Sequence, residues 1–108
     1  MSHLTVSHGA DFFGEDHHPL KAVVALAPYV TSSFAWNDRA KVAPLTRLLE
    51  NPAATTIPPS EAAALSEQLL KVARCPHLKP KPSALARALA DAAGRAAADD
   101  EPWEWRVA

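Results

Sequence analysis

The segment 103–107, Trp-Glu-Trp-Arg-Val, constrains the fold more than any other part of the chain. Trp103, Trp105 and Val107 alternate with charged residues, and this period of two predicts a β-strand with one buried face. Two indole rings on a strand need a broad apolar surface to cover them. The alanine-rich segment 83–98 is predicted to be a helix with a low, smooth face, so we expect the rings to pack against it.

A strand of this kind also needs neighbouring strands, because an isolated strand is not stable in water. Leu4 and Val6 alternate with polar residues over 4–7, which predicts a strand near the beginning of the sequence. Thr55–Ile57 is a shorter β-prone segment. We expect Trp103–Val107 to pair with 4–7, with Thr55–Ile57 beside them.

Four helices are predicted from apolar residues that recur every three or four positions, with prolines marking their ends. The predicted ranges are 19–27, 41–50, 59–74 and 83–98. Pro28 is expected to end the first helix. The polar segment 31–38 is expected to be a loop that Phe34 and Trp36 anchor to the body of the domain, and the proline-rich segment 75–82 an extended connector.

These elements predict an α+β fold, with about four helices packed on one face of a small sheet. The sheet is expected to have two or three mainly antiparallel strands and to pair the N-terminal and C-terminal strands. With 108 residues, the chain is expected to form one small globular domain over 1–108. The 48% hydrophobic content overstates the core, since alanine buries little apolar area.

Composition excludes several classes of partner and compartment. The formal net charge of −1, from eleven basic and twelve acidic residues, provides no global field for nucleic acid or an anionic membrane. No apolar run approaches the roughly 20 residues that cross a bilayer, and we expect no secretory leader, since residues 1–5 lack its basic and apolar regions. The single Cys75 excludes an intramolecular disulfide and fits a reducing compartment. We therefore expect a cytoplasmic protein with no membrane partner.

The stretch 7–18 holds most of the glycines, phenylalanines and histidines of the chain and is expected to be a loop. In one interpretation this loop contacts a partner protein. The residues predicted to make that contact are His8, Asp11, Phe12, Phe13, Glu15 and Asp16. In a structural interpretation, its glycines form turns, its aromatic side chains cover the edge of the core, and Asp16 or His18 caps the helix beginning at Pro19.

The same loop offers imidazole and carboxylate groups of the type that bind Zn²⁺ or another divalent ion. The alternative metal ligands are His8, Asp11, Asp16 and His18. Their spacing matches no established motif. His17 and His18 are adjacent, so their side chains diverge and cannot easily bind one ion.

Catalysis has little support in the sequence. Ser7, His8 and either Asp11 or Glu15 contain the groups of a nucleophile, a base and an orienting acid, but nothing places them together. No glycine motif for nucleotide binding or for a nucleophile elbow occurs. We predict no catalytic residue and no cofactor.

Two further surfaces could contact a partner. Arg74, Lys79 and Lys81 form a sparse basic cluster that is the alternative nucleic-acid site, although the near-zero net charge speaks against nucleic acid as a partner. Trp103–Val107 is expected to leave an unpaired sheet edge. Such an edge permits a homodimer or the addition of a partner strand.

Three phrases resemble small proteins from high-GC actinobacteria and their mobile elements. They are SHGADFFGED at 7–16, IPPSEAAAL at 57–65 and EPWEWR at 101–106. The resemblance implies a compact cytoplasmic domain from a family of unknown function. It carries over no catalytic or binding residue, and it favours an accessory or regulatory role related to phages or plasmids.

The function that the sequence favours is a non-enzymatic protein-interaction or regulatory accessory module, with the 9–18 loop and the neighbouring sheet edge as its contact surface. The alternatives are a metal-binding or metal-dependent enzyme that uses the N-terminal His and Asp residues, and a nucleic-acid-binding accessory protein.

Overall fold

The computed structural model describes residues 3–7 and 15–107, and it confirms the α+β class with four α-helices. The elements in chain order are β1 (His3–Ser7), β2 (Glu15–Pro19), α1 (Leu20–Ser33), the 3-10 turn η1 (Trp36–Asp38), α2 (Arg39–Glu50), β3 (Thr55–Ile57), α3 (Pro59–Ala73), α4 (Pro80–Ala98) and β4 (Trp103–Val107). The sheet has four antiparallel strands in the order β2-β1-β4-β3, so the expectation of two or three strands was wrong.

The predicted pairing of β1 with β4 is confirmed. Leu4 lies opposite Val107 and Val6 opposite Trp105, and β3 pairs with the other side of β4. β4 is therefore a central strand within the described sheet, and the expectation that it leaves an open edge was wrong. The edge strands are β2 and β3 instead.

The strand that the sequence did not predict is β2. Its residues, Glu-Asp-His-His-Pro, show no apolar alternation and were expected to be a loop. They pair with β1 over the full length of that strand, from His3 opposite Pro19 to Ser7 opposite Glu15. A hydrogen bond of 2.9 Å joins Thr5 Oγ1 and His17 Nδ1 across the two strands. Pairing with an apolar neighbour therefore makes this polar segment a strand.

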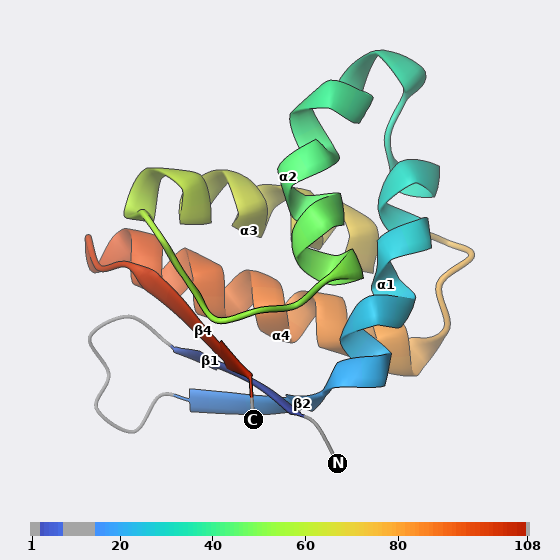
Figure 1. The fold of residues 1–108 in the computed structure, drawn as a ribbon. Helices are drawn as coiled ribbons and strands as arrows, with labels where there is room; N and C mark the ends of the chain where they lie inside the picture. The colour runs from blue at the N-terminus through green and yellow to red at the C-terminus, as the bar shows by residue number, and fades with distance from the viewer. Residues whose placement is uncertain (1–2, 8–14, 108) are drawn as a thin grey trace.

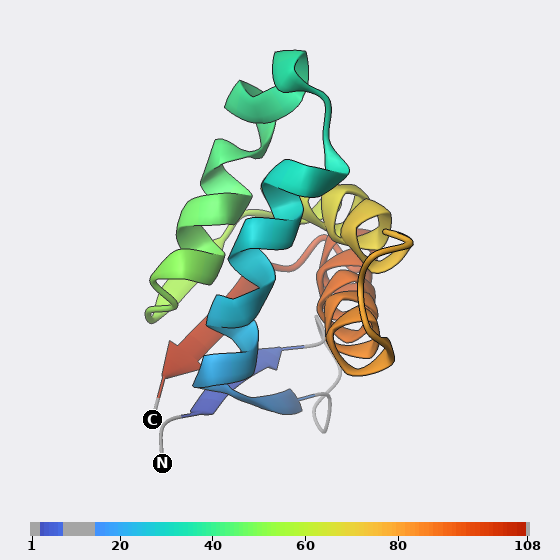
Figure 2. The ribbon, with the colours of Figure 1, turned by 90° about the vertical axis from the view of Figure 1, so that its right-hand side faces the viewer.

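One face of the sheet carries the core. Leu4, Val6, Trp103 and Trp105 are at most 1% exposed, and the helices lie on their side of the sheet, as Figures 1 and 2 show. The two indole rings meet edge to face, with centroids 5.3 Å apart. α4 contacts both β1 and β4 and buries an alanine-rich face, so the prediction that the tryptophans lie next to this low helix face is confirmed.

The first helix continues past the proline that was expected to end it. Pro28 lies inside α1, and Val30 beyond it is fully buried. The proline removes one backbone donor, but the last turn is held by hydroxyl groups: Thr31 Oγ1 donates to the Pro28 carbonyl at 2.9 Å, and Ser33 Oγ donates to that of Tyr29 at 2.7 Å. Burial of the apolar stripe thus outweighs the effect of the proline.

The connector before the last helix is shorter than predicted, because α4 begins at Pro80 and includes Pro82 in its first turn. Ser83 Oγ donates to the Ala73 carbonyl at 2.6 Å and so gives the last carbonyl group of α3 a hydrogen-bond partner. α3 and α4 approach each other closely at Gly94. A Cβ atom added there would lie 3.1 Å from Ser66 Oγ of α3.

The helices form two pairs, α1 with α2 and α3 with α4. Contacts within each pair are extensive, whereas contacts between the two pairs are few. Figure 1 shows the α1–α2 pair extending away from the sheet, while α3 and α4 run side by side above it. Within the described ranges, none of the helices is both long and apolar enough to cross a membrane.

Candidate functional site

The residues predicted from the opening stretch are only partly described. His8, Asp11, Phe12 and Phe13 lie outside the described residues, and of Glu15 only the backbone is described, in β2. Asp16 and His18 are half-buried, whereas His17 between them is exposed. This alternation confirms that the two adjacent histidines point to opposite faces. The partner-contact set therefore stays a prediction.

The alternative metal site has no further support from the described part of the chain. No group of three or more His, Cys, Asp or Glu side chains is close enough there to hold a metal ion. His8 and Asp11 of the predicted ligand set are outside that part. The proposed capping role of Asp16 or His18 was wrong, because no side chain caps α1 at Pro19.

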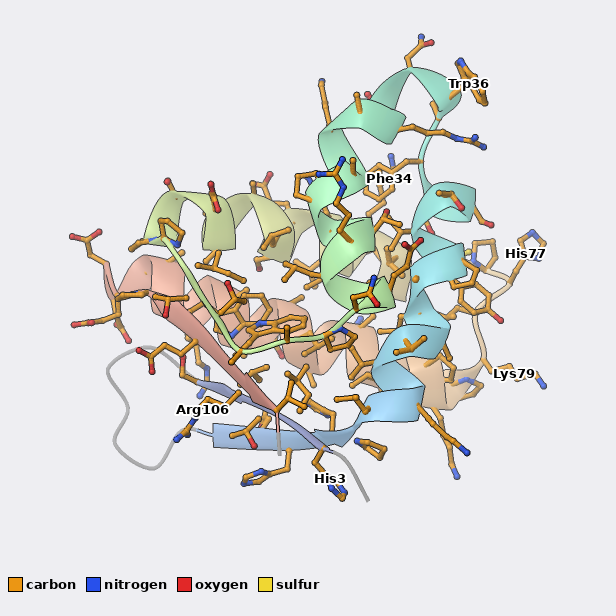
Figure 3. The ribbon with its side chains drawn as sticks, viewed as in Figure 1. His3, Phe34, Trp36, His77, Lys79 and Arg106 are labelled. Carbon is orange, nitrogen blue, oxygen red and sulfur yellow. The ribbon has the colours of Figure 1, made fainter. Side chains whose placement is uncertain are left out.

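The three basic residues of the alternative nucleic-acid site are exposed but dispersed. Arg74 follows α3, Lys79 precedes α4, and Lys81 lies in the first turn of α4. Figure 3 shows Lys79 and His77 pointing away from the body of the protein. The cation–π contacts seen among the described residues involve Arg39 and Lys71 instead of these three residues. The segment 74–81 therefore has the character of a solvated turn.

The most distinctive surface feature is Trp36, which the sequence predicted to be an anchor in the body of the domain. Its side chain is 75% exposed, so that prediction was wrong. Trp36 lies in η1, at the turn between α1 and α2, and Figure 3 shows it at the outer end of this helix pair. Phe34, by contrast, is half-buried and packs against the core, as expected.

Two cations hold these aromatic rings. The guanidinium carbon of Arg39 lies 4.4 Å from the centre of the Trp36 ring, and Lys71 Nζ of α3 lies 4.7 Å from that of Phe34. Lys41 Nζ is 3.8 Å from Asp38 in the same turn. We call Phe34, Trp36 and Arg39 the aromatic tip. The only signal in the sequence was the spacing of three between Trp36 and Arg39, which brings their side chains together on a helical turn.

A groove lies below the aromatic tip, between α2, α3 and β3. Its volume is about 320 Å³. The residues that define it here, and that we call the β3 groove, are Lys41, Pro44 and Leu48 from α2, Thr55–Ile57, and Glu61, Ala64, Leu65 and Gln68 from α3. Its walls are mainly apolar, with Lys41 and Glu61 as the charged groups.

A second hollow of similar volume connects the β3 groove to the aromatic tip. It is lined by Phe34, Asp38, Val42, Glu67 and Lys71, and it shares Lys41 and Gln68 with the groove. Gln68 Nε2 donates to the Lys41 carbonyl at 3.4 Å, which joins α3 to α2 at this point. The β3 groove therefore continues, through this second hollow, as far as Phe34 of the aromatic tip.

A third hollow, of about 460 Å³, lies between α1 and α4 at the end of β2. It is lined mostly by small apolar side chains such as Ala22, Ala25 and Ala88, together with His18 and Lys81. It brings one residue of the predicted metal set next to one of the predicted nucleic-acid set. These two side chains do not form a site for either ligand.

Comparison with known proteins gives a family but no activity. No curated protein and no solved structure matches the chain. One family model matches residues 9–106, which include the four described α-helices, β2, β3, most of β4 and the aromatic tip. The chain therefore belongs to the family described as "Domain of unknown function (DUF7739)".

Proposed function

We propose that this protein is a non-enzymatic protein-interaction module of the cytoplasm, with an accessory or regulatory role, and that it binds its partner through the aromatic tip. The observation that carries the proposal is the 75% exposure of Trp36 at the end of a projecting helix pair. Trp and Arg dominate the residues that contribute most to protein–protein binding, and an indole buried on association removes a large apolar area from water.

The tip is held in place before it meets a partner. Arg39 stacks on the Trp36 ring, and Phe34 anchors the start of the turn against the core. α1 and α2 fix the two ends of the segment. A side chain that is already ordered loses less conformational entropy on binding, so more of the contact energy appears as affinity.

The charges around the tip favour a protein partner over nucleic acid. Asp38 and Glu67 lie among Arg39, Lys41 and Lys71, so acidic and basic groups alternate over the same surface. The three basic groups would attract a polyanion and the two carboxylates would oppose it, whereas a protein surface can present complementary charges of both signs. The formal net charge of −1 agrees with this reading.

The surface predicted from the sequence, the 9–18 loop and the neighbouring sheet edge, is proposed as a second contact region. Glu15 and Asp16 lie on the edge strand β2, which has a free side in the described sheet. An accessory role also agrees with the resemblance to small proteins of actinobacteria and their mobile elements. A homodimer through the β2 edge is part of the same proposal.

The test starts with co-purification of the tagged protein from its host, followed by titration calorimetry with the recovered partner. Trp36→Ala is expected to weaken binding about thirtyfold, because a side chain that dominates an interface contributes about 2 kcal/mol or more. Val24→Ala is the matched control, since Val24 is an exposed apolar residue like Trp36 but lies in α1, outside the aromatic tip. It should leave binding unchanged.

Equal affinities for the wild type and Trp36→Ala would overturn the proposed tip. Release of the bound material by nuclease would show that the partner is nucleic acid and would overturn the protein-interaction function itself.

A further inference from the structure

We propose that the β3 groove binds an extended segment of a partner protein, which adds to the sheet as a strand next to β3. The inference rests on the proposed protein-interaction function and names the form in which the partner is bound. It is carried by the direction of the backbone groups of Thr56, by the apolar walls of the groove and by its two charged residues.

The direction of the backbone groups follows from β4. The Glu104 amide donates to Ser7 Oγ at 2.9 Å, so the backbone of Glu104 faces β1. Adjacent residues of a strand direct their backbone groups to opposite sides, so Trp103 and Trp105 face β3. These two residues lie opposite Ile57 and Thr55. The N–H and C=O groups of Thr56, between them, therefore point outward from the edge of the sheet, where no other strand of the described residues pairs with β3.

The free edge is short and has a defined end. Pro58 follows β3 directly and has no N–H group, and its carbonyl accepts the amide of Ala62 at 2.9 Å. An added strand can therefore pair with Thr56 and the residues before it, but not beyond Ile57. With so short a ladder, the side chains of the bound segment must contribute much of the affinity.

The groove is placed to receive those side chains. Figure 1 shows the β3 segment running between α2 and α3, with both helices on one side of it. Side chains of a strand alternate between two faces, so every second side chain of an added strand would point between these helices. There they would meet the apolar groups of Pro44, Leu48, Ala64 and Leu65.

The charges of the groove define the sequence that fits. Gln68 Nε2 of α3 donates to the backbone carbonyl of Lys41, whose exposed ammonium group lies near Asp38, and Glu61 lies seven residues before Gln68 on α3. At 1.5 Å per residue this separation is about 10 Å along the helix, which about three residues of extended chain would span. The bound segment should therefore carry an acidic residue near Lys41, a basic residue near Glu61 and apolar residues between them.

A second copy of this chain fits the groove less well than a peptide. Two β3 strands paired about a two-fold axis perpendicular to the sheet would place the helices of both copies on the same face. α2 of one copy would then face α3 of the other across the groove that must take the inserted side chains. An extended segment without helices of its own avoids this conflict. The groove also leads through Lys41 and Gln68 to the aromatic tip, so one partner can occupy both.

The test uses a phage-displayed library of random seven-residue peptides against the full chain, and then fluorescence anisotropy with the most enriched peptide. The enriched sequences are expected to alternate apolar residues with polar ones and to include one acidic and one basic residue. Thr56→Pro removes the outward N–H and should weaken binding about tenfold. Thr56→Ala keeps the N–H and should change binding less than about twofold.

A second pair of variants tests the groove without changing the strand. Ala64 lines the groove, whereas Ala63 is an exposed neighbour on the same helix outside it. Ala64→Trp should fill the groove and weaken peptide binding about tenfold or more, and Ala63→Trp should not. Thermal melting of all four variants checks that each remains folded.

Any of three results with the peptides would overturn the inference. They are the absence of enriched peptides, enriched peptides with apolar residues every three or four positions, and equal binding by wild type, Thr56→Pro and Ala64→Trp. Self-association that Thr56→Pro abolishes would show that a second copy occupies the edge and would also overturn it. If the recovered partner responds to Trp36→Ala but not to Thr56→Pro or Ala64→Trp, the proposed function stands and this inference fails.

Discussion

Gly94 and Ser66 provide a quantitative test of how closely α3 and α4 pack. Replacing a glycine in the interior of a helix by alanine usually stabilises the helix by about 1 kcal/mol. At Gly94 the new Cβ would lie 3.1 Å from Ser66 Oγ, which donates to the Ala90 carbonyl at 2.7 Å. The Ser66 hydroxyl must then shift and its hydrogen bond, which contributes about 1 kcal/mol, is weakened. Gly94→Ala is therefore expected to leave the free energy of unfolding nearly unchanged.

In the Ser66→Ala background, Gly94→Ala should show the helix stabilisation that the contact with the Ser66 hydroxyl cancels in the wild type. Without the hydroxyl, the nearest atom to the new Cβ is the Cβ of residue 66 at 3.9 Å, which is an ordinary contact. Ser66→Ala alone should cost about 1 kcal/mol. Gly94→Ala added to it should then stabilise the protein by about 1 kcal/mol and raise the melting temperature by about 4 °C.

The assay is a double-mutant cycle measured by urea unfolding and by thermal melting, with a coupling energy of about 1 kcal/mol expected between the two positions. If Gly94→Ala stabilises the wild type as much as it stabilises Ser66→Ala, the two helices are not in the close contact described above, and the reasoning is refuted.

Other predictions concern the core, the proline in α1 and the exposed indole. Trp105→Ala is expected to destabilise the protein by about 3–5 kcal/mol in urea unfolding, since Trp105 is 1% exposed; a loss below about 1 kcal/mol would contradict its burial. Pro28→Ala should stabilise the protein by about 1–2 kcal/mol, because the residue is exposed and an alanine restores a backbone donor of α1; a lower melting temperature would contradict this. Acrylamide should quench mainly the fluorescence of Trp36, and Trp36→Phe should remove most of that quenching, because the other two indoles are buried. Equal quenching in both proteins would contradict the exposure of Trp36.

The parts of the fold that the sequence predicted are those with strong local signals. α3 begins at Pro59 and carries a regular apolar stripe, so its range could be predicted nearly to the residue. β4 alternates tryptophan with charge, and its pairing with β1 followed from the instability of an isolated strand in water. The helix termination predicted at Pro28 failed because the burial of Val30, which depends on tertiary packing, outweighed the local rule.

The polar strand and the exposed tryptophan lacked such signals. β2 has no apolar alternation, and it is a strand because β1 pairs with it. Trp36 was expected to be buried, as most tryptophans largely are, and nothing in its neighbourhood marked it as an exception apart from Arg39. The β3 groove depends on how far α2 and α3 diverge, which no residue pattern specifies. The candidate site was therefore found from the structure, and the fold class from the sequence.

The position of β4 between β1 and β3 has a consequence for synthesis on the ribosome. β1 and β2 are translated first and β3 halfway through, yet the strand that joins them is not available until residues 103–107 leave the exit tunnel. Such long-range pairing slows folding. Until it occurs, the apolar face of the β1–β2 pair is not stably buried. The α3–α4 pair, by contrast, can assemble as soon as residue 98 emerges. We expect nascent chains that lack residues 103–107 to be the form of this protein most dependent on chaperones.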